Sequence, residues 1–546
     1  MKRLIALLLA CLLLTGCAPA AQQPLPTDSA PVDYPTDSAE TLNLDYASAF
    51  DFETEIHLSD SGIDISGPNS DTVALTHDII YYEDKDIYES GNPYGEGSDG
   101  DKHTAEEAEK YVVVNITAPG AYRVSGKLSA GQIRVDLGED AYEDATARVE
   151  LILDNVDITC TVAPAILFLN VYECDGNWSV ETAKSEVDTS YAGANLILAE
   201  GSRNTVNGSY VARIYKDQEG EKKLWKQDGA VYSYMSMNVF GPGSLDVTAE
   251  NEGLDTELHL TINGGEIAIR SGNDGINTNE DGVSVTTING GNLHIIAGLG
   301  EEGDGVDSNG YLVINGGTVI ASANPAADAG LDSDLGSYVN GGTVIALGST
   351  MDWAESDSNQ VTMNLQFASY RESSDAIVIT KEDGSEVFSY NPAADAIVGE
   401  NARRYMGAVI SCAEFAQGET YQVYVNGDQM MYTGTDVRMR PGAMGGGFGD
   451  RRPNGAQQPE LPAGETMPEG WTPGERGERP EGFGRQEPPE GQLPTWPEGE
   501  MSSDWEKRGE SSKGFGKTDR QNGEGNSLFY MQDKVNCFSG LTAVSE

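Results

Sequence analysis

The chain has 546 residues and a formal net charge of −54, because 88 Asp and Glu outnumber 34 Lys and Arg. A chain this acidic lacks the cationic side chains that bind phosphate, which excludes nucleic acid as a partner and disfavours electrostatic docking on anionic lipid. Its excess of carboxylates points to divalent cations or, alternatively, to a solubility strategy.

The N-terminus is predicted to be a bacterial lipoprotein signal peptide, residues 1–16. Two basic residues precede an apolar run, 4–14, that is too short for a transmembrane helix. The sequence LTGC ends at Cys17 and has the form of a lipobox, so we expect cleavage before Cys17 and lipidation of this cysteine; the alternative is an ordinary secretory signal. The lipid would hold the mature, extracellular chain on the outer face of the cell membrane through a flexible, Pro-rich tether, 17–41.

The strongest pattern in the chain is an internal repeat, in which Asn-Gly-Gly lies between short β-branched runs. The repeated asparagines are Asn263, Asn289, Asn315 and Asn340, separated by 26, 26 and 25 residues. A fixed period of this length indicates a solenoid, and the alternating apolar runs and Gly-rich turns exclude helical repeats. We therefore predict an all-β chain whose residues 112–359 form a right-handed single-stranded parallel β-helix of about 25 residues per coil.

Two features of the coil follow from this prediction. The four asparagines are expected to stack as a structural ladder rather than to bind a ligand. Ten apolar residues are expected to fill the interior: Ile262, Ile267, Ile269, Ile288, Leu293, Ile295, Ile314, Val319, Val339 and Val344.

An acidic motif repeats within the same coils, as Gly-x-Asp/Asn-Ser/Thr-x. Three of its aspartates, Asp255, Asp307 and Asp332, each precede the ladder asparagine of their coil by eight residues. Carboxylates stacked about 4.8 Å apart would repel one another unless a hard cation compensates them. We therefore predict Ca²⁺ at this corner; the alternative is that the side chains only cap turns. The candidate ligands are Asp255, Glu257, Asp274, Asn277, Asn279, Asp304, Asp307, Asn309, Asp328, Asp332 and Asp334.

The flanking segments are expected to close the solenoid, because an open end would expose apolar surface and strand edges. Residues 42–111 are predicted to be an N-terminal β cap, and 360–440 a small antiparallel β module. From 441 to 546 the composition shifts to Gly, Pro, Glu and Arg without strand or helix period, so this tail is predicted to be disordered.

The order of these motifs resembles a known family, the bacterial surface proteins called carbohydrate-binding domain-containing proteins. The resemblance covers roughly 110–440 and is carried by segments 122–137, 149–160, 165–171, 196–210 and 229–257, followed by the Asn-Gly-Gly coils. It implies a parallel β-helix that binds calcium and pectic polymers such as polygalacturonate. The family usually has Asp-Gly where this chain has Asn207-Gly208, Glu252-Gly253 and Asn277, which implies fewer charges at the first calcium position.

Our leading hypothesis from the sequence is a monomeric, non-catalytic binder of acidic polysaccharide, with calcium bridging protein and uronate carboxylates. Sugar-stacking aromatic residues could be Tyr232, Tyr234, Tyr338 or Trp353. The alternatives are a β-helix enzyme, either a pectate lyase or a polygalacturonase, and a structural adhesin. A lyase needs a base near its calcium, whereas an inverting hydrolase needs two carboxylates with room for a water between them.

Overall fold

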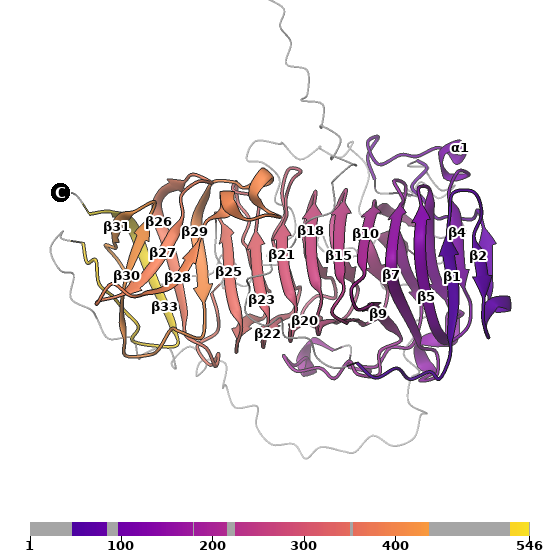
Figure 1. The fold of residues 1–546 in the computed structure, drawn as a ribbon, viewed down its shortest axis with the longest axis horizontal. Coiled ribbons are helices and arrows are strands. Elements are labelled where there is room, and N and C mark those ends of the chain that lie inside the picture. Colours follow the sequence, from indigo (N-terminus) through magenta and orange to yellow (C-terminus); the bar gives the residue numbers. More distant parts are fainter. Residues whose placement is uncertain are drawn as a thin grey trace, which may run out of the picture. The chain divides into compact units, whose positions relative to one another are not determined.

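The structure, a computed structural model, describes residues 46–84, 95, 97–177, 179–215, 224–349, 353–435 and 525–544. The chain divides into two units, Met1–Pro31 and Val32–Glu546, and every described residue belongs to the second. Strands dominate the described residues (Figure 1), so the predicted all-β class is confirmed. The predicted signal peptide and tether, 1–41, lie outside these residues.

Helical structure is scarce in the described part of the chain. One α-helix, α1 (Ala105–Ala108), is present, and it is far too short to cross a membrane, as are all the described helices. The remaining helical segments are 3-10 turns at Ser70–Thr72, Glu139–Glu143, Val180–Thr182, Pro392–Ala394 and Gly399–Asn401.

Parallel strands stack into three ladders, because the β-branched runs of successive repeats pair in register. The first ladder contains β4 (Val112–Ile116), β6 (Gly131–Asp136), β8 (Ile166–Asn170), β13 (Gly229–Ser233), β16 (Glu252–Thr256) and β19 (Ile276–Thr278). The second ladder contains β1 (Glu53–Leu58), β5 (Gly120–Leu128), β7 (Val149–Thr159), β9 (Ala194–Leu198), β14 (Met237–Phe240), β17 (Leu260–Ile262), β20 (Val285–Ile288), β22 (Tyr311–Ile314) and β24 (Gly336–Val339). The third continues from β7 through β10 (Arg203–Gly208), β15 (Ser244–Ala249), β18 (Glu266–Ser271), β21 (Asn292–Ile296), β23 (Thr318–Ser322) and β25 (Thr343–Gly348).

Consecutive strands along the chain belong to different ladders, as β16, β17 and β18 do. The sheets as a whole are mixed, because antiparallel pairs lie at both ends of the ladders. At the N-terminal end β2 (Asp64–Ser66) pairs with β1, and β3 (Val73–Thr76) with β4. A separate antiparallel pair, β11 (Val211–Tyr215) and β12 (Leu224–Gln227), precedes β13.

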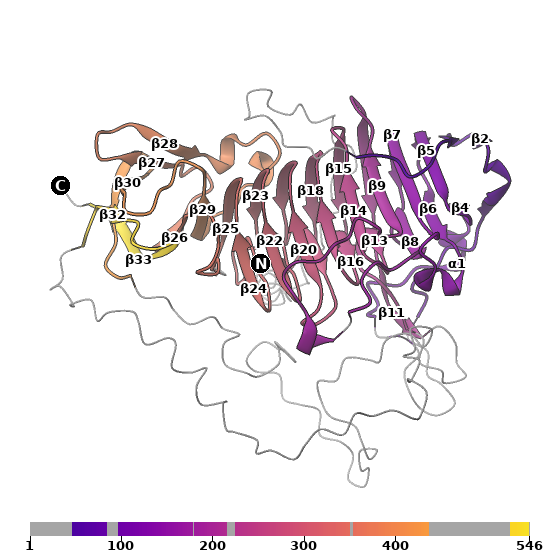
Figure 2. The same cartoon turned by 90° about the horizontal axis from the view of Figure 1, so that it is seen from below.

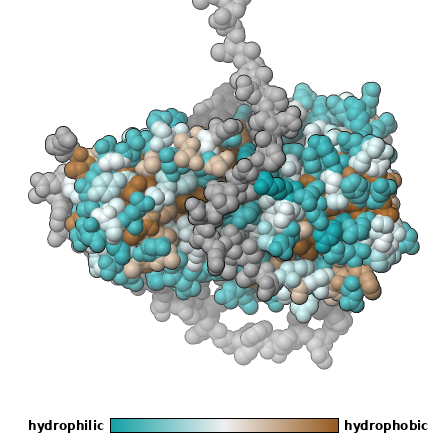
Figure 3. Space-filling model, in the orientation of Figure 1, coloured by the Kyte–Doolittle hydropathy of each residue, from teal (hydrophilic) through white to brown (hydrophobic). Residues whose placement is uncertain are grey.

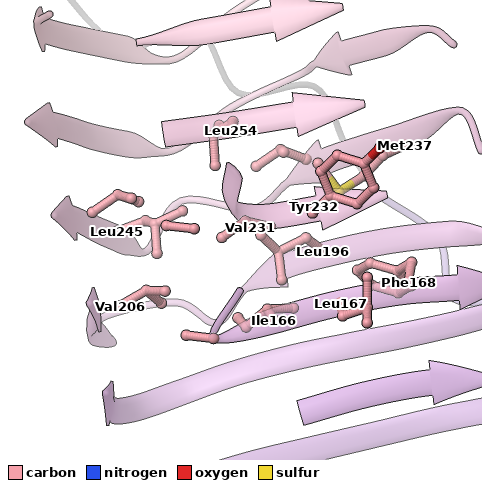
Figure 4. Packing of buried hydrophobic residues seen from close by; sticks show 14 of the residues in the cluster. Ile166, Leu167, Phe168, Leu196, Val206, Val231, Tyr232, Met237, Leu245 and Leu254 are labelled. Carbon is pink, nitrogen blue, oxygen red and sulfur yellow. The ribbon is translucent and has the colours of Figure 1, made fainter. Parts of the chain in front are cut away.

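The inward side chains of the three ladders form one apolar core (Figure 4). Alternation along each strand sends every second side chain inward, and equal register keeps like residues stacked. Ile262, Ile288, Ile314 and Val339 are directly paired in this way. All ten residues predicted to fill the interior are at most 1% exposed, so that prediction is confirmed.

The predicted asparagine ladder is also confirmed. The Nδ2 atoms of Asn289, Asn315 and Asn340 each donate to Oδ1 of the preceding ladder asparagine at 2.9 Å, beginning at Asn263. The outer surface is otherwise polar: the described residues on the face in Figure 3 are mostly hydrophilic, with separate apolar patches, as expected for the high net charge.

Beyond β25 the chain forms an antiparallel region with its own core. Its strands are β26 (Thr362–Arg371), β27 (Ile377–Lys381), β28 (Glu386–Tyr390), β29 (Tyr405–Ser411), β30 (Thr420–Val425) and β31 (Asp428–Met431). It joins the third ladder through the antiparallel pair β25–β29.

The prediction that the whole of 441–546 is disordered is wrong for its last residues. Within 525–544, β32 (Phe529–Tyr530) pairs with β30, and β33 (Val535–Ala543) pairs with β26. This segment contains no proline, and its apolar side chains, including Phe538 and Leu541, are buried in the C-terminal core. The disorder prediction included this segment because the residues before it are rich in Gly and Pro.

We expect Phe538→Ala to destabilise the protein by about 3–5 kcal/mol, because a buried aromatic ring is replaced by a cavity. Phe538 is 3% exposed and its ring centroid lies 4.9 Å from that of Phe529. Denaturant unfolding would measure the loss. Tyr530→Ala, at a position that is 51% exposed, is the matched control and should change the free energy of unfolding little. Equal effects of both substitutions would contradict the burial of this segment.

Candidate functional site

A column of glycines brings the acidic motifs of successive coils close together. If Gly253 carried a Cβ, that atom would lie 2.4 Å from the carbonyl oxygen of Gly275; the corresponding distance from Gly275 to Gly305 is 2.5 Å, and from Gly305 to Gly330 it is 2.4 Å. No side chain fits at these contacts. Glycine therefore permits a backbone approach that places the flanking acidic residues in register.

The acidic residues that flank this column lie in three rows, which we call the acidic edge. The row before the glycines contains Glu252, Asp274 and Asp304, as the bonds Gly253 N–H to Asp274 O and Gly275 N–H to Asp304 O show. Two residues after the glycines come Asp255, Asn277, Asp307 and Asp332. The next outward row contains Glu257, Asn279, Asn309 and Asp334. The structure thus brings the predicted ligand candidates to one edge, and Asp328 accepts from Gly303 N at 2.9 Å beside it.

The tightest group on this edge is one that the sequence prediction only partly found. Asp228, Glu252 and Asp255 each offer a carboxylate oxygen, and these three atoms lie within 4.8 Å of one another. The three residues are 9%, 4% and 0% exposed. Asp228 and Glu252 were not among the predicted ligands, although Asp228-Gly229 repeats the carboxylate-before-glycine pattern of Asp274-Gly275. The resemblance implies Asp at the position of Glu252. The longer glutamate side chain still brings a carboxylate oxygen into this group.

Hydrogen bonds satisfy only part of this group. Asn277 Nδ2 donates to Glu252 Oε1 at 3.2 Å, and Asn279 Nδ2 donates to Asp255 Oδ1 at 2.6 Å. Three buried oxygens, Glu252 Oε2, Asp255 Oδ2 and Asn277 Oδ1, have no hydrogen-bond partner. All three are acceptors, and leaving a buried acceptor without a donor is costly. The site therefore lacks positive charge or donors where these oxygens converge.

Electrostatic repulsion in the group is strong. Burial, together with the charge of Asp228, raises the pKa of Glu252 to about 7. Burial and then the neighbouring Glu252 raise the pKa of Asp255 well above its ordinary value. Further along the edge, burial and then the charge of Asp307 raise the pKa of Asp274. Burial and then the charge of Asp304 raise the pKa of Asp307.

One cation of the protein itself lies in the first group. Lys226, on β12, forms an ion pair with Asp228, and its Nζ donates to Asn279 Oδ1 at 3.3 Å. Burial acts to lower the pKa of Lys226, but the surrounding carboxylates, Asp228 foremost, outweigh it and raise the pKa above its ordinary value. Set against three carboxylates, one ammonium leaves two negative charges uncompensated, which matches the charge of one divalent cation.

The donor set fits a hard cation. Carboxylate and amide oxygens are the ligands that Ca²⁺ takes, in groups of roughly six to eight with backbone oxygens and water. Zinc and copper favour nitrogen and sulfur, and no His or Cys belongs to the group. Among the residues that the structure describes, this is the one cluster of three or more such side chains.

Two of the four aromatic residues predicted to stack on sugars are buried. The prediction is wrong for Tyr232 and Tyr234, which are 0% and 8% exposed, because a stacking ring needs an open face. Tyr232 instead donates to Glu257, and Tyr234 donates to the carbonyl oxygen of Lys226 at 3.0 Å. Tyr232 lies in the same column as Asp255, whereas its neighbour Val231 pairs with the core residue Leu254. Its ring is nevertheless buried, and it packs against that of Tyr234 at a centroid distance of 5.1 Å. Tyr338 and Trp353 are half-buried and stay predictions, while Cys17 lies outside the described residues.

The fold and the site define a class: an all-β protein of stacked parallel ladders with a buried carboxylate cluster on one edge. A family model described as carbohydrate-binding domain-containing protein matches residues 110–413. The chain therefore belongs to the family of carbohydrate-binding domain-containing proteins.

Two individual proteins are similar to parts of the chain. A carbohydrate-binding domain-containing protein of Acetivibrio thermocellus is 30% identical over 178 residues, which are 32% of this chain and 51% of that relative. This chain thus spans about half the length of that relative. A solved structure titled polysaccharide lyase-like protein from C. thermocellum, a gadolinium derivative, is 20% identical with a TM-score of 0.32, and the match covers 56% of this chain and 97% of that one.

Proposed function

We propose that this protein binds an acidic polysaccharide at the cell surface without cleaving it, through calcium held on the acidic edge. The observation that carries the proposal is the buried carboxylate cluster of Asp228, Glu252 and Asp255, in which Glu252 Oε2 and Asp255 Oδ2 have no hydrogen-bond partner among the described residues. A bound cation would compensate these oxygens.

The proposed scaffold is a right-handed single-stranded parallel β-helix. Support comes from the three parallel ladders, to which the chain returns in its later coils with a period close to that of the repeat. In the second ladder Ile262 pairs with Ile288, and Ile288 pairs with Ile314. The first ladder continues beyond β19 through single bridges from Ile276 to Val306 and from Val306 to Leu331.

Asp228, Glu252, Asp255 and Asn277 would hold the calcium ion. Asp274, Asp304 and Asp307 lie further along the edge, but their carboxylates do not form a second such cluster in the described structure, so the proposal places one ion only. When bound, calcium would supply positive charge to the buried oxygens of the cluster. The protein residues hold the ion and shape the edge around it.

The polysaccharide part of the proposal rests on the family and on charge. Calcium favours oxygen ligands and completes its coordination with carboxylates, so a uronate carboxylate is a suitable further ligand. A chain with net charge −54 would otherwise repel an anionic polymer. The lipobox at Cys17 supports display on the outer face of the membrane, where the divalent cation would be available.

The test is retention of polygalacturonate by the immobilised full chain, in calcium and after addition of a chelator. We expect calcium-dependent retention, release by chelator, and polymer of unchanged length. Polymer that passes through equally in calcium and in chelator would contradict the proposal.

A pectate lyase is the second candidate, because Lys226 places a basic residue beside the carboxylate cluster. The ion pair with Asp228 keeps this ammonium protonated, and a protonated lysine cannot accept a proton from substrate. Ultraviolet absorbance of unsaturated uronate in the same retention experiment would support the lyase; we expect none. New reducing ends without that absorbance would indicate a hydrolase.

A further inference from the structure

A groove lies on a different face of the protein from the acidic edge. Its volume is about 640 Å³, within the roughly 300–1,000 Å³ typical of ligand sites. Its floor consists of outward side chains of β20, β22 and β24, which lie side by side in Figure 2. Thr287, Val313 and Tyr338 are paired neighbours across these strands, and Asn289, Asn315 and Asn340 follow two residues later. We call it the ladder groove.

One wall of the ladder groove is the segment Ser185–Asp188, which neighbouring contacts hold in place. Thr189 Oγ lies 2.7 Å from Asn238 Oδ1 and 2.8 Å from Thr261 Oγ1, and its carbonyl oxygen accepts from Asn238 Nδ2 at 2.8 Å. Asn238 and Thr261 occupy the same outward column as Thr287, on the preceding coils. Thr189 thus covers this column up to β17, and the groove begins where that cover ends.

The chain that precedes the wall segment is also held, at Glu173 and Asp175. The carboxylate of Glu173 accepts from Ser236 N at 2.8 Å and from Ser236 Oγ at 2.9 Å. Asp175 lies 3.3 Å from Nε2 of the buried His259. The groove is therefore preformed, which reduces the ordering cost of binding.

The floor offers repeated hydrogen-bonding groups. The two middle ladder amides, Asn289 and Asn315, each use one N–H and one carbonyl lone pair for their neighbours, but an amide has two of each. Asn289 and Asn315 thus each retain one N–H and one lone pair after their ladder bonds. These groups repeat once per coil, at about the 4.8 Å spacing of paired strands. A repeating hydroxyl-bearing chain matches such a row.

The charge of the ladder groove separates it from the acidic edge. Three carboxylates line it, those of Glu186, Asp188 and Asp357, and none of its twelve lining residues is Lys, Arg or His. Glu186, Asp188 and Asp357 are all exposed and do not form a metal cluster with one another in the described structure. A uronate chain would meet uncompensated repulsion here, whereas carboxylates accept hydrogen bonds from neutral sugar hydroxyls.

We infer that the ladder groove is a second carbohydrate site, which binds uncharged glycan segments without calcium. The half-buried Tyr338 provides the aromatic floor, and its ring contacts that of Tyr311 at a centroid distance of 6.2 Å. This inference deepens the proposed function, since it rests on carbohydrate as the ligand, but it does not depend on the cation site. Together the two sites would let one protein hold neutral and acidic parts of a mixed polysaccharide.

Titration of the full chain with neutral hexasaccharides tests this, using maltohexaose, cellohexaose and xylohexaose, with hexagalacturonate as the charged comparison. We expect at least one neutral hexasaccharide to bind equally in calcium and in chelator. Tyr338→Ala should weaken that binding by at least about tenfold, as truncation of a central aromatic contact does.

Two controls make the outcome decisive. Tyr191→Ala removes a tyrosine that is 65% exposed and outside the groove, and it should leave neutral binding unchanged. Asp255→Asn should weaken hexagalacturonate binding alone, so that failure of the cation site is distinguished from failure of the groove. The inference is overturned if no neutral hexasaccharide binds, or if Tyr338→Ala and Tyr191→Ala have the same effect.

Discussion

Asp255→Asn is expected to lower calcium affinity by at least about 100-fold, or about 2.7 kcal/mol. The substitution keeps the size of the side chain but removes one of the three charges of the cluster, including an oxygen that has no other partner. Calorimetric titration of the chelator-treated full chain would measure the change. Asp71→Asn, the same substitution at an exposed position, is the matched control and should leave the affinity unchanged.

Asp255→Asn should be more stable than the wild-type protein without calcium and less stable than the wild-type protein with calcium. Without cation, Asp255 is a buried acid surrounded by like charges, so the neutral asparagine should raise the melting temperature. With calcium, the wild-type protein gains more binding energy and should become the more stable of the two. A variant that was merely misfolded would be less stable in both conditions. Equal calcium affinity in Asp255→Asn and wild type would rule out the cluster as the metal site.

Lys226→Met should act in the opposite direction on affinity. Its ammonium ion-pairs with Asp228 and repels any cation that enters the cluster. Removing this charge should raise calcium affinity by about tenfold, or about 1.4 kcal/mol. The same titration measures it, and a fall in affinity would show that Lys226 helps to form the site instead.

Gly275→Ala is expected to destabilise the protein by about 3 kcal/mol or more. The new Cβ would lie 2.1 Å from Ile295 Cγ2 and 2.5 Å from the carbonyl oxygen of Gly305, so the two coils would have to separate. Gly275 is not among the glycines with positive φ, so the substitution tests close approach rather than backbone strain. Denaturant unfolding gives the free-energy change, and calcium titration should show weaker binding because the rows of ligands lose register.

Gly176→Ala is the control for this prediction. An added Cβ at Gly176 would meet no atom within 4 Å, and its φ is also not positive. Its free energy of unfolding should therefore stay within about 0.5 kcal/mol of wild type. Should Gly275→Ala be equally harmless, the close stacking of the glycine column would be refuted.

The repeating part of the chain was predictable because the same residue types recur at the same spacing in successive coils. The spacing of Asn263, Asn289, Asn315 and Asn340 indicated stacked coils, and the apolar residues between them indicated the core. Both signals are local in sequence, and each is repeated often enough to outweigh irregularities. The Gly-Asp register likewise placed most acidic residues on a common edge.

The irregular parts could not be predicted in the same way. The ring of Tyr232 lies in the column of Asp255, and its burial depends on contacts with Tyr234 and Glu257 that no local pattern in β13 specifies. The pairing of β33 with β26 joins segments about 170 residues apart, across a stretch whose composition carries no strand signal. Nothing local in either segment specifies its partner.

The linear order of residues was thus sufficient for the all-β class, the core and the acidic edge, since these follow from short periodic patterns. Folding in three dimensions decided which carboxylates converge: Asp228, Glu252 and Asp255 meet, with Lys226 beside them. It also decided that a distant wall segment borders the ladder groove. The physical reason is that a binding site depends on distances between side chains on different coils, whereas a repeat only specifies the spacing within each.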